Sequence, residues 1–192
     1  PSDDSPPSDD SPPSDAPPSS MGRLAARGSD LIDAAGQVVH LRGVNWFGME
    51  TETFSPHGLW TRSMESMLDQ IADLGYNCLR IPFSNEMFDA GSIPGGIDSS
   101  ANPDLVNLSP VEILDRLIER CERRGLAVIL DRHRPDSRGQ SDLWYTDRYS
   151  EERWIADWVR LAQRYRHTAA VVGFDLHNEP HGRATWGDFY HV

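Results

Sequence analysis

Four short apolar segments alternate with three amphipathic segments, and this alternation restricts the fold more than any other feature of the chain. The apolar segments predict strands at about residues 43–47, 77–82 and 126–131 and from Val171 onward. The amphipathic segments predict helices at about 62–74, from Ser109 to Gly125, and from Ser150 to Tyr165. Because the strands are apolar along most of their length, we expect a parallel sheet that helices cover.

The predicted connections differ in length at the two ends of the strands. Those from helix to strand are short, at 75–76, 125 and 167–170, whereas those from strand to helix are long, at 48–61, 83–108 and 133–149. Long loops in a compact domain are usually functional, and here all three follow the carboxyl ends of strands. The fold class indicated is α/β, a (β/α)8 TIM barrel present as its first half, with an N-terminal hairpin at 31–41, strands 1–4 and helices 1–3. A dinucleotide-binding sheet fits less well, because residues 45–50 lack its glycine motif.

Residues 1–20 repeat a Pro-Ser-Asp-Asp-Ser-Pro unit and hold no aromatic or basic residue. Such a segment cannot bury enough apolar area to offset the entropy of ordering, so we expect a disordered linker. Linkers of this kind usually tether a second module, which would precede Pro1; a simple disordered tail is the alternative. The domain prediction is therefore a linker at 1–20 and part of a catalytic domain at 21–192.

The net charge of −12 argues against nucleic acid and against an anionic membrane surface as partners. No apolar run approaches the roughly 20 residues that a membrane-spanning helix needs. Cys78 and Cys121 are too few for a disulfide framework. Their expected positions, one in a strand and one on a helix, predict two buried thiols that do not pair.

Several polar residues stand where the predicted strands end. Arg80 lies inside an apolar strand, and a buried charge requires a carboxylate partner, either in a structural ion pair or in an active site. His133 could bind a substrate hydroxyl or a neighbouring carboxylate, or be a satisfied core histidine. A metal site is not indicated, because His177 and His181 lack helical context and no other ligand spacing is present.

The last predicted strand leads into Asn178, Glu179 and Pro180. An apolar strand that carries a carboxylate and an amide to its carboxyl end is typical of an active site in a barrel of this kind. Glu179 is therefore the candidate proton donor, and Asn178 the candidate ligand of a substrate hydroxyl. The alternative is that both are solvated turn residues ahead of the proline.

Aromatic residues are frequent in the predicted long loops. Exposed rings on a binding face suit flat ligands such as pyranoses, because a ring combines a large contact area with a fixed geometry. One or two of these rings could instead pack loops together. The candidate substrate-binding rings are Trp46, Trp60, Trp144 and Tyr145.

These residues occur in motifs that resemble those of the family 5 glycoside hydrolases of clan A. The motifs are Leu-Arg-Ile-Pro at 79–82, Asp-Arg-His-Arg-Pro at 131–135 and Asp-Leu-His-Asn-Glu-Pro at 175–180. Residues 44–48, 57–60 and 141–145 resemble the bacterial secreted endo-β-1,4-glucanases of that family in particular. The similarity runs from about Leu31 to Trp186.

The resemblance implies a retaining mechanism with two carboxylates and no cofactor. Glu179 matches the family's general acid/base and Asn178 the amide that holds the sugar 2-hydroxyl. Arg80 matches the arginine beside the nucleophile, and His133 a histidine that lines the site of cleavage. The resemblance also implies a β-1,4-linked glucan as substrate, secretion to the extracellular space, and an upstream carbohydrate-binding module.

The family's nucleophile is a glutamate on the seventh strand, and no residue of this chain matches it. A complete barrel has about 250 residues, so we expect the chain by itself to be inactive. Two alternatives remain open from the sequence. One is a related β-mannanase or xyloglucanase on the same scaffold, and the other is a non-catalytic carbohydrate-binding barrel.

Overall fold

The computed structural model describes residues 22–184, so the linker predicted at 1–20 lies outside the described residues. Within this range a parallel sheet has the strand order β3-β4-β5-β6, the order of the strands in the chain. The strands are β3 (Gly43–Asn45), β4 (Cys78–Ser84), β5 (Ala127–Arg134) and β6 (Val171–Asp175). The four predicted strands and their parallel pairing are therefore confirmed.

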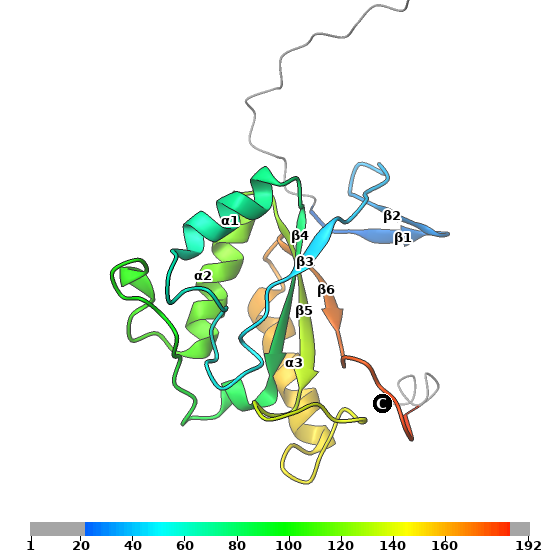
Figure 1. Cartoon of the computed structure of the whole chain (residues 1–192). Coiled ribbons are helices and arrows are strands. Elements are labelled where there is room, and N and C mark those ends of the chain that lie inside the picture. Colours follow the sequence, from blue (N-terminus) through cyan, green and yellow to red (C-terminus); the bar gives the residue numbers. More distant parts are fainter. Residues whose placement is uncertain (1–21, 185–192) are drawn as a thin grey trace, which may run out of the picture.

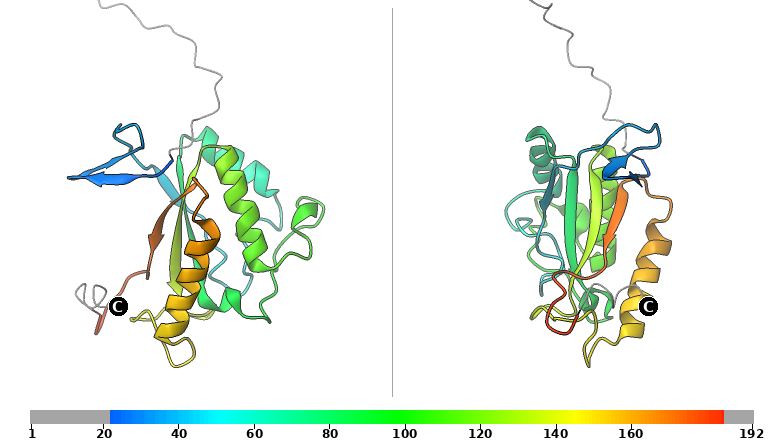
Figure 2. Two further views of the ribbon diagram at one scale, coloured as in Figure 1. Left: turned by 180° about the vertical axis from the view of Figure 1, so that it is seen from behind. Right: turned by 90° about the vertical axis from the view of Figure 1, so that its right-hand side faces the viewer.

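Helices α1 (Met64–Asp73), α2 (Pro110–Arg123) and α3 (Glu151–Tyr165) follow the first three of these strands. They lie along the outer side of the curved sheet, and the inner side carries no helix within residues 22–184 (Figures 1 and 2). The carboxyl ends of the strands lie together at one end of the sheet, and the long loops start there (Figure 1). No helix in the described range is long and apolar enough to span a bilayer.

Serine residues begin all three helices. The side chain of Ser109 accepts a hydrogen bond from the Glu112 amide, and the Glu112 carboxylate accepts one from the Ser109 amide at 2.7 Å. This reciprocal pair satisfies two amides that a helix start leaves without partners. Ser63 and Ser150 cap α1 and α3 through their side chains. The helix starts predicted at Ser109 and Ser150 are both confirmed.

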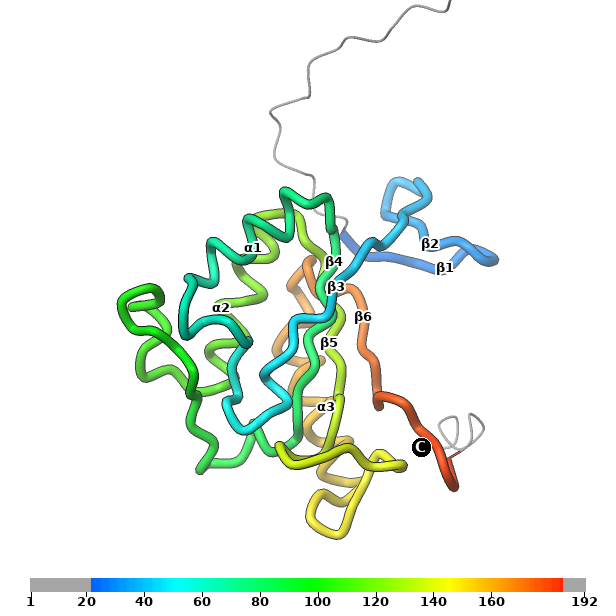
Figure 3. The backbone as a smooth tube through the Cα atoms, in the orientation of Figure 1, coloured from blue at the N-terminus to red at the C-terminus, as the bar shows by residue number. Residues whose placement is uncertain are grey.

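The N-terminal hairpin differs from its prediction. Strands β1 (Ala25–Arg27) and β2 (Asp30–Ile32) pair with each other. The predicted pairing across 31–41 is present as a short antiparallel contact, with a bridge between Ile32 and Val38 and a backbone bond from the Val39 N–H to the Leu31 carbonyl at 2.8 Å. β1 was missed because Ala-Ala-Arg shows no alternation of apolar and polar residues. The hairpin lies at the amino end of the sheet and projects away from the helices (Figure 3).

The core fills the space between the sheet and the helices, but α3 departs from its predicted pattern. The amphipathic pattern predicts a buried face made of Trp154, Ile155, Trp158, Leu161, Ala162 and Tyr165. Four of these are buried, whereas Ile155 is 39% exposed and Ala162 is exposed as well. Asp157 is buried although it is charged, because Asn85 donates to it and Arg153 pairs with it. The apolar flank of α3 at Ile155 has no covering element within the described residues.

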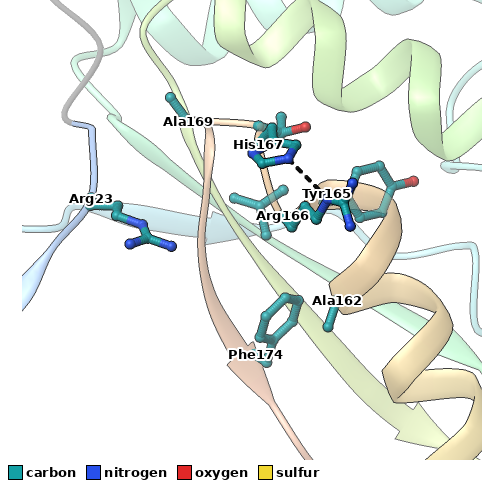
Figure 4. A pocket seen from close by; sticks show the side chains of 9 residues that line it. Arg23, Ala162, Tyr165, Arg166, His167, Ala169 and Phe174 are labelled. Atoms are coloured by element: carbon teal, nitrogen blue, oxygen red, sulfur yellow. Dashed lines mark hydrogen bonds between the residues drawn. The ribbon is translucent and has the colours of Figure 1, made fainter.

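A hollow of about 530 Å³ lies beside α3 and the start of β6, at the amino end of the sheet. Tyr165, Arg166, His167 and Phe174 contribute to its wall (Figure 4). The hollow is therefore separate from the face on which the long loops lie.

Cys78 and Cys121 are both free and buried, as predicted. Burial raises the pKa of the Cys78 thiol to about 11 and that of Cys121 to about 12. Both therefore remain protonated at neutral pH, because a thiol in apolar surroundings disfavours its charged form.

Candidate active site

Arg80 joins three segments on the inner face of the sheet. Its guanidinium contacts Asp131 Oδ2 of β5 at 3.0 Å and Asp175 Oδ2 of β6 at 2.7 Å. It also donates to Asn178 Oδ1 at 2.9 Å. The predicted carboxylate partner of Arg80 is thus confirmed, and the structure supplies two. The same guanidinium fixes the orientation of the Asn178 amide.

His133 lies beside this cluster, near the end of β5. Its Nδ1 is 2.6 Å from Asp131 Oδ2. An ionised carboxylate can only accept, so Nδ1 donates this bond, and in the neutral ring Nε2 is an acceptor. The neighbouring carboxylate expected for His133 is therefore present.

Asp131 is fully buried. Burial raises the pKa of its carboxyl group above the ordinary value, while His133 and Arg80 act in the opposite direction. Its Oδ1 atom has no hydrogen-bond partner among the described residues. Asp131 therefore depends on Arg80 and His133 for its compensation, and both contact the same oxygen atom.

Asn178 and Glu179 follow β6 but differ in environment. Asn178 is 8% exposed, and its backbone N–H donates to the Arg132 carbonyl at 3.1 Å. Its burial and its bond to Arg80 contradict the alternative of a solvated turn residue. Glu179 is exposed, and its backbone φ of 49° lies in the left-handed region that few residues other than glycine adopt. Such strained residues are concentrated at active sites.

The Glu179 carboxylate has one neighbour that sequence reasoning missed. Gln140, in the loop after β5, places Nε2 at 3.4 Å from Glu179 Oε2. A single polar residue in a long loop gives no periodic or compositional signal, so only the folded loop identifies Gln140.

The candidate aromatic residues divide into two groups. Trp60 and Tyr145 are exposed by 52% and 39%, as expected of binding rings. Trp46 and Trp144 are buried, with 6% and 7% exposed, so these two rings match the alternative that rings pack loops together. Their loops fold back against the body of the domain, and the indole N–H groups bond to the His57 carbonyl at 2.9 Å and to Glu151 at 2.6 Å.

The opposite side of the strands holds a buried group that was also missed. Successive side chains of a strand point to opposite faces, so Arg132 points away from Asp131 and His133. Arg132 is fully buried and bonds to Asn85, to His177 and to the Trp144 carbonyl. Its place between two inward-facing residues is a signal that could have indicated this outward orientation.

A metal-binding arrangement does not occur in the part of the chain that the structure describes, where no three His, Cys, Asp or Glu side chains are grouped to hold an ion. The polar groups at the carboxyl ends are instead an arginine, two aspartates, a histidine, an amide and an exposed glutamate. This set of groups can bind hydroxyl groups and transfer a proton.

Comparison with known proteins gives consistent results. The profile described as "Cellulase (glycosyl hydrolase family 5)" matches residues 32–191. An endoglucanase of Paenibacillus polymyxa is 53% identical over 169 residues, which are 88% of this chain and 43% of that protein. The major extracellular endoglucanase of Xanthomonas campestris is 46% identical over 82% of this chain and 32% of its own length.

Solved structures agree with the sequence matches. The catalytic domain of the Xanthomonas campestris endoglucanase superposes with a TM-score of 0.81 at 44% identity, covering 85% of this chain and 47% of that one. An endocellulase of Pyrococcus horikoshii, solved as a variant with cellotetraose, gives 0.78 at 39% identity and covers 90% and 47%. The chain therefore spans about half or less of the length of these relatives, and the prediction that it is the first half of a TIM barrel is confirmed. On the match over residues 32–191 and these identities, the chain belongs to glycosyl hydrolase family 5, the cellulase family.

Proposed function

We propose that the chain forms the N-terminal part of a retaining endo-β-1,4-glucanase that hydrolyses cellulose-type polysaccharides. The observation that carries the proposal is the pair at the end of β6, where Arg80 fixes Asn178 and the next residue, Glu179, presents a carboxylate to solvent. The relatives named as endoglucanases at 53% and 46% identity support this assignment.

In this mechanism Glu179 first protonates the leaving glycosidic oxygen. The second carboxylate attacks the anomeric carbon, and the C–O bond to the leaving sugar breaks. Glu179 then removes a proton from the water that hydrolyses the glycosyl-enzyme. Its exposed position and its contact with a neutral amide, Gln140, leave the carboxylate open to substrate.

The second carboxylate must lie about 5–5.5 Å from the first in a retaining enzyme. Asp131 is fully buried, and Asp175, whose side chain is 36% exposed, ends the strand that leads to Glu179; neither residue matches the place of the family's nucleophile on the seventh strand. We propose that the nucleophile belongs to the part of the barrel outside the 192 residues. It would then lie near Arg80, and the chain by itself would not turn over substrate.

The other residues would bind the glucan. Asn178 would hold the 2-hydroxyl of the sugar at the cleaved bond, and His133 Nε2 would accept from a further hydroxyl. Trp60 and Tyr145 have the exposed ring surface that sugar stacking needs. The buried Trp46 and Trp144 would act mainly by holding the loops, since their indole N–H groups already have partners.

The test is a Glu179→Gln substitution in the complete catalytic domain. Loss of a general acid/base should lower kcat on a soluble cellulosic substrate by about 10²–10⁴-fold. Glycosylation by an aryl cellobioside with a good leaving group needs little protonation and should change far less. Equal losses on both substrates would remove Glu179 from the role of the acid. Glu119→Gln, an exposed glutamate on α2, is the matched control and should leave both rates unchanged.

We further propose that the enzyme is secreted and that residues 1–20 connect it to a carbohydrate-binding module. One relative is named an extracellular endoglucanase, and the Pro-, Ser- and Asp-rich composition suits an extended spacer. Sequencing the reading frame upstream of Pro1 tests both points, because it should encode an export signal and a second domain.

A further inference from the structure

Arg132 connects three segments of the carboxyl-end face. Its Nε donates to Asn85 Oδ1 at 2.7 Å, its Nη1 to His177 Nδ1 at 2.8 Å, and its Nη2 to the Trp144 carbonyl at 2.9 Å. Asn85 follows β4, Trp144 lies in the loop after β5, and His177 follows β6. The guanidinium has no exposed surface, so all three bonds are made without competition from bulk water.

The contact with Arg132 determines the tautomer of His177. A guanidinium can only donate, so His177 Nδ1 must be the acceptor. The ring proton is then on Nε2, which lies 3.0 Å from the Ser141 carbonyl and donates to it. Both nitrogen atoms of the ring are therefore occupied, and the side chain is only 4% exposed. His177 is fixed at both ends, between strand β5 and the loop that follows it.

This arrangement lies directly behind the proposed acid. Glu179 is two residues beyond His177. The backbone N–H of Asn178, which lies between them, donates to the backbone carbonyl of Arg132. The loop that receives the His177 bond at Ser141 also carries Gln140, whose amide faces the Glu179 carboxylate. Arg132 and His177 therefore bond both to the backbone next to Glu179 and to the loop that carries Gln140.

The strained backbone conformation of Glu179 needs contacts that hold it in place. A non-glycine residue with φ of 49° persists only where its surroundings enforce it. Without the anchor at His177, the segment 177–179 could relax to an ordinary conformation, and the carboxylate would move. A displacement of about 1 Å at a reacting group can cost about 10²-fold in rate.

We propose that Arg132 and His177 are positioning residues, which act through the backbone of residues 177–179 and through Gln140 to place the Glu179 carboxylate for proton transfer. This inference rests on the proposed function, because it concerns the general acid of that reaction. Neither residue touches the substrate. Their effect should therefore be confined to steps in which Glu179 transfers a proton.

The first test uses His177→Leu in the complete catalytic domain, which removes both ring bonds. On a soluble cellulosic substrate kcat should fall by about 10–10²-fold, with KM within twofold. Glycosylation by an aryl cellobioside with a good leaving group should fall less than threefold. His177→Gln, which can accept from Arg132 and donate to Ser141, should recover most of the loss. Arg120→Met removes a buried arginine that joins α1 and α2, and is the control for destabilisation alone.

Equal losses of kcat on both substrates, per folded molecule, would overturn the positioning role, as would full activity of His177→Leu. A second measurement does not depend on the folding of a variant. The ¹⁵N spectrum of wild-type histidines should show His177 with an unprotonated Nδ1 and a protonated Nε2 at neutral pH, and the opposite tautomer would overturn the proposal. Failure of the proposed function itself is distinguishable, since it appears as wild-type inactivity on cellulosic substrates or as full activity of Glu179→Gln.

Discussion

Arg80 and Arg132 lie on neighbouring strands of one sheet, but their surroundings are opposite in kind. Arg80 is partly open to solvent on the inner face and meets two carboxylates, Asp131 and Asp175. Arg132 is fully buried on the outer side, and its three bonds within residues 22–184 go to neutral acceptors. Burial lowers the pKa of Arg132 to about 10, although Asp131 acts to raise it.

The comparison separates two uses of a buried arginine. Arg80 compensates negative charge and orients an amide where chemistry is proposed. Arg132 connects loops through hydrogen bonds whose acceptors carry no charge. Burying a cation without a bonded carboxylate lowers the free energy of unfolding, and this cost accompanies the hydrogen bonds by which Arg132 connects the loops. The two residues should consequently respond differently to removal.

The largest effect is expected from Arg80→Met. It leaves Asp131 fully buried without a cation and Asp175 without its partner. Breaking a buried ion pair from one side typically costs about 3–5 kcal/mol. Urea unfolding of the complete catalytic domain should show this loss. The double variant Arg80→Met/Asp131→Asn should recover part of it, and a loss below about 1 kcal/mol in the single variant would contradict the role of Arg80 as the compensating charge.

Arg132→Met should cost less than Arg80→Met. It removes one hydrogen bond from each of three neutral acceptors, and an orphaned buried polar group costs about 1–3 kcal/mol. The methionine also removes an uncompensated charge, which offsets part of that cost. The same urea titration measures both variants. A larger loss for Arg132→Met than for Arg80→Met would show that the outer bonds, and not the inner charges, dominate stability at this end of the sheet.

Acid is expected to lower the stability of the domain through His177. Burial, together with the Arg132 charge, lowers the pKa of His177 from 6.5 to about 4, so the folded state favours the neutral ring. This stabilisation is complete above about pH 6.5 and is lost as the pH falls toward about 4, at up to about 1.4 kcal/mol per pH unit. His177→Gln should show a shallower fall in the free energy of unfolding across this window. Parallel curves for the two proteins would mean that His177 does not titrate differently in the folded state.

Deletion of residues 1–20 should have the smallest effect. Their composition provides no apolar surface that could pack on the inner or the outer side of the sheet. The melting temperature of the catalytic domain and its activity on soluble substrate should remain unchanged within error. A fall of several degrees would show that the segment contributes to the folded domain.

The sequence by itself determined the alternation of strands and helices, the caps at Ser109 and Ser150, and the end of the sheet on which the long loops lie. These follow from local physics, because hydrophobic period, capping chemistry and loop length are properties of contiguous residues. It also required a carboxylate for Arg80, since a charge inside an apolar strand cannot remain unpaired. Asn178 and Glu179 could be identified for a similar local reason, as polar residues at the end of an apolar strand.

Only the tertiary structure decided which groups meet. It paired Arg80 with both Asp131 and Asp175, buried Trp46 and Trp144, and left Ile155 exposed. It also brought Arg132 against His177 across 45 positions of sequence. Sequence periodicity states whether a side chain faces inward or outward, but the distance between two strands' side chains depends on register and on how the long loops fold back. For this reason the sequence predicted that Arg80 has a carboxylate partner. It did not predict the hydrogen bonds that Arg132 makes on the outer side of the sheet.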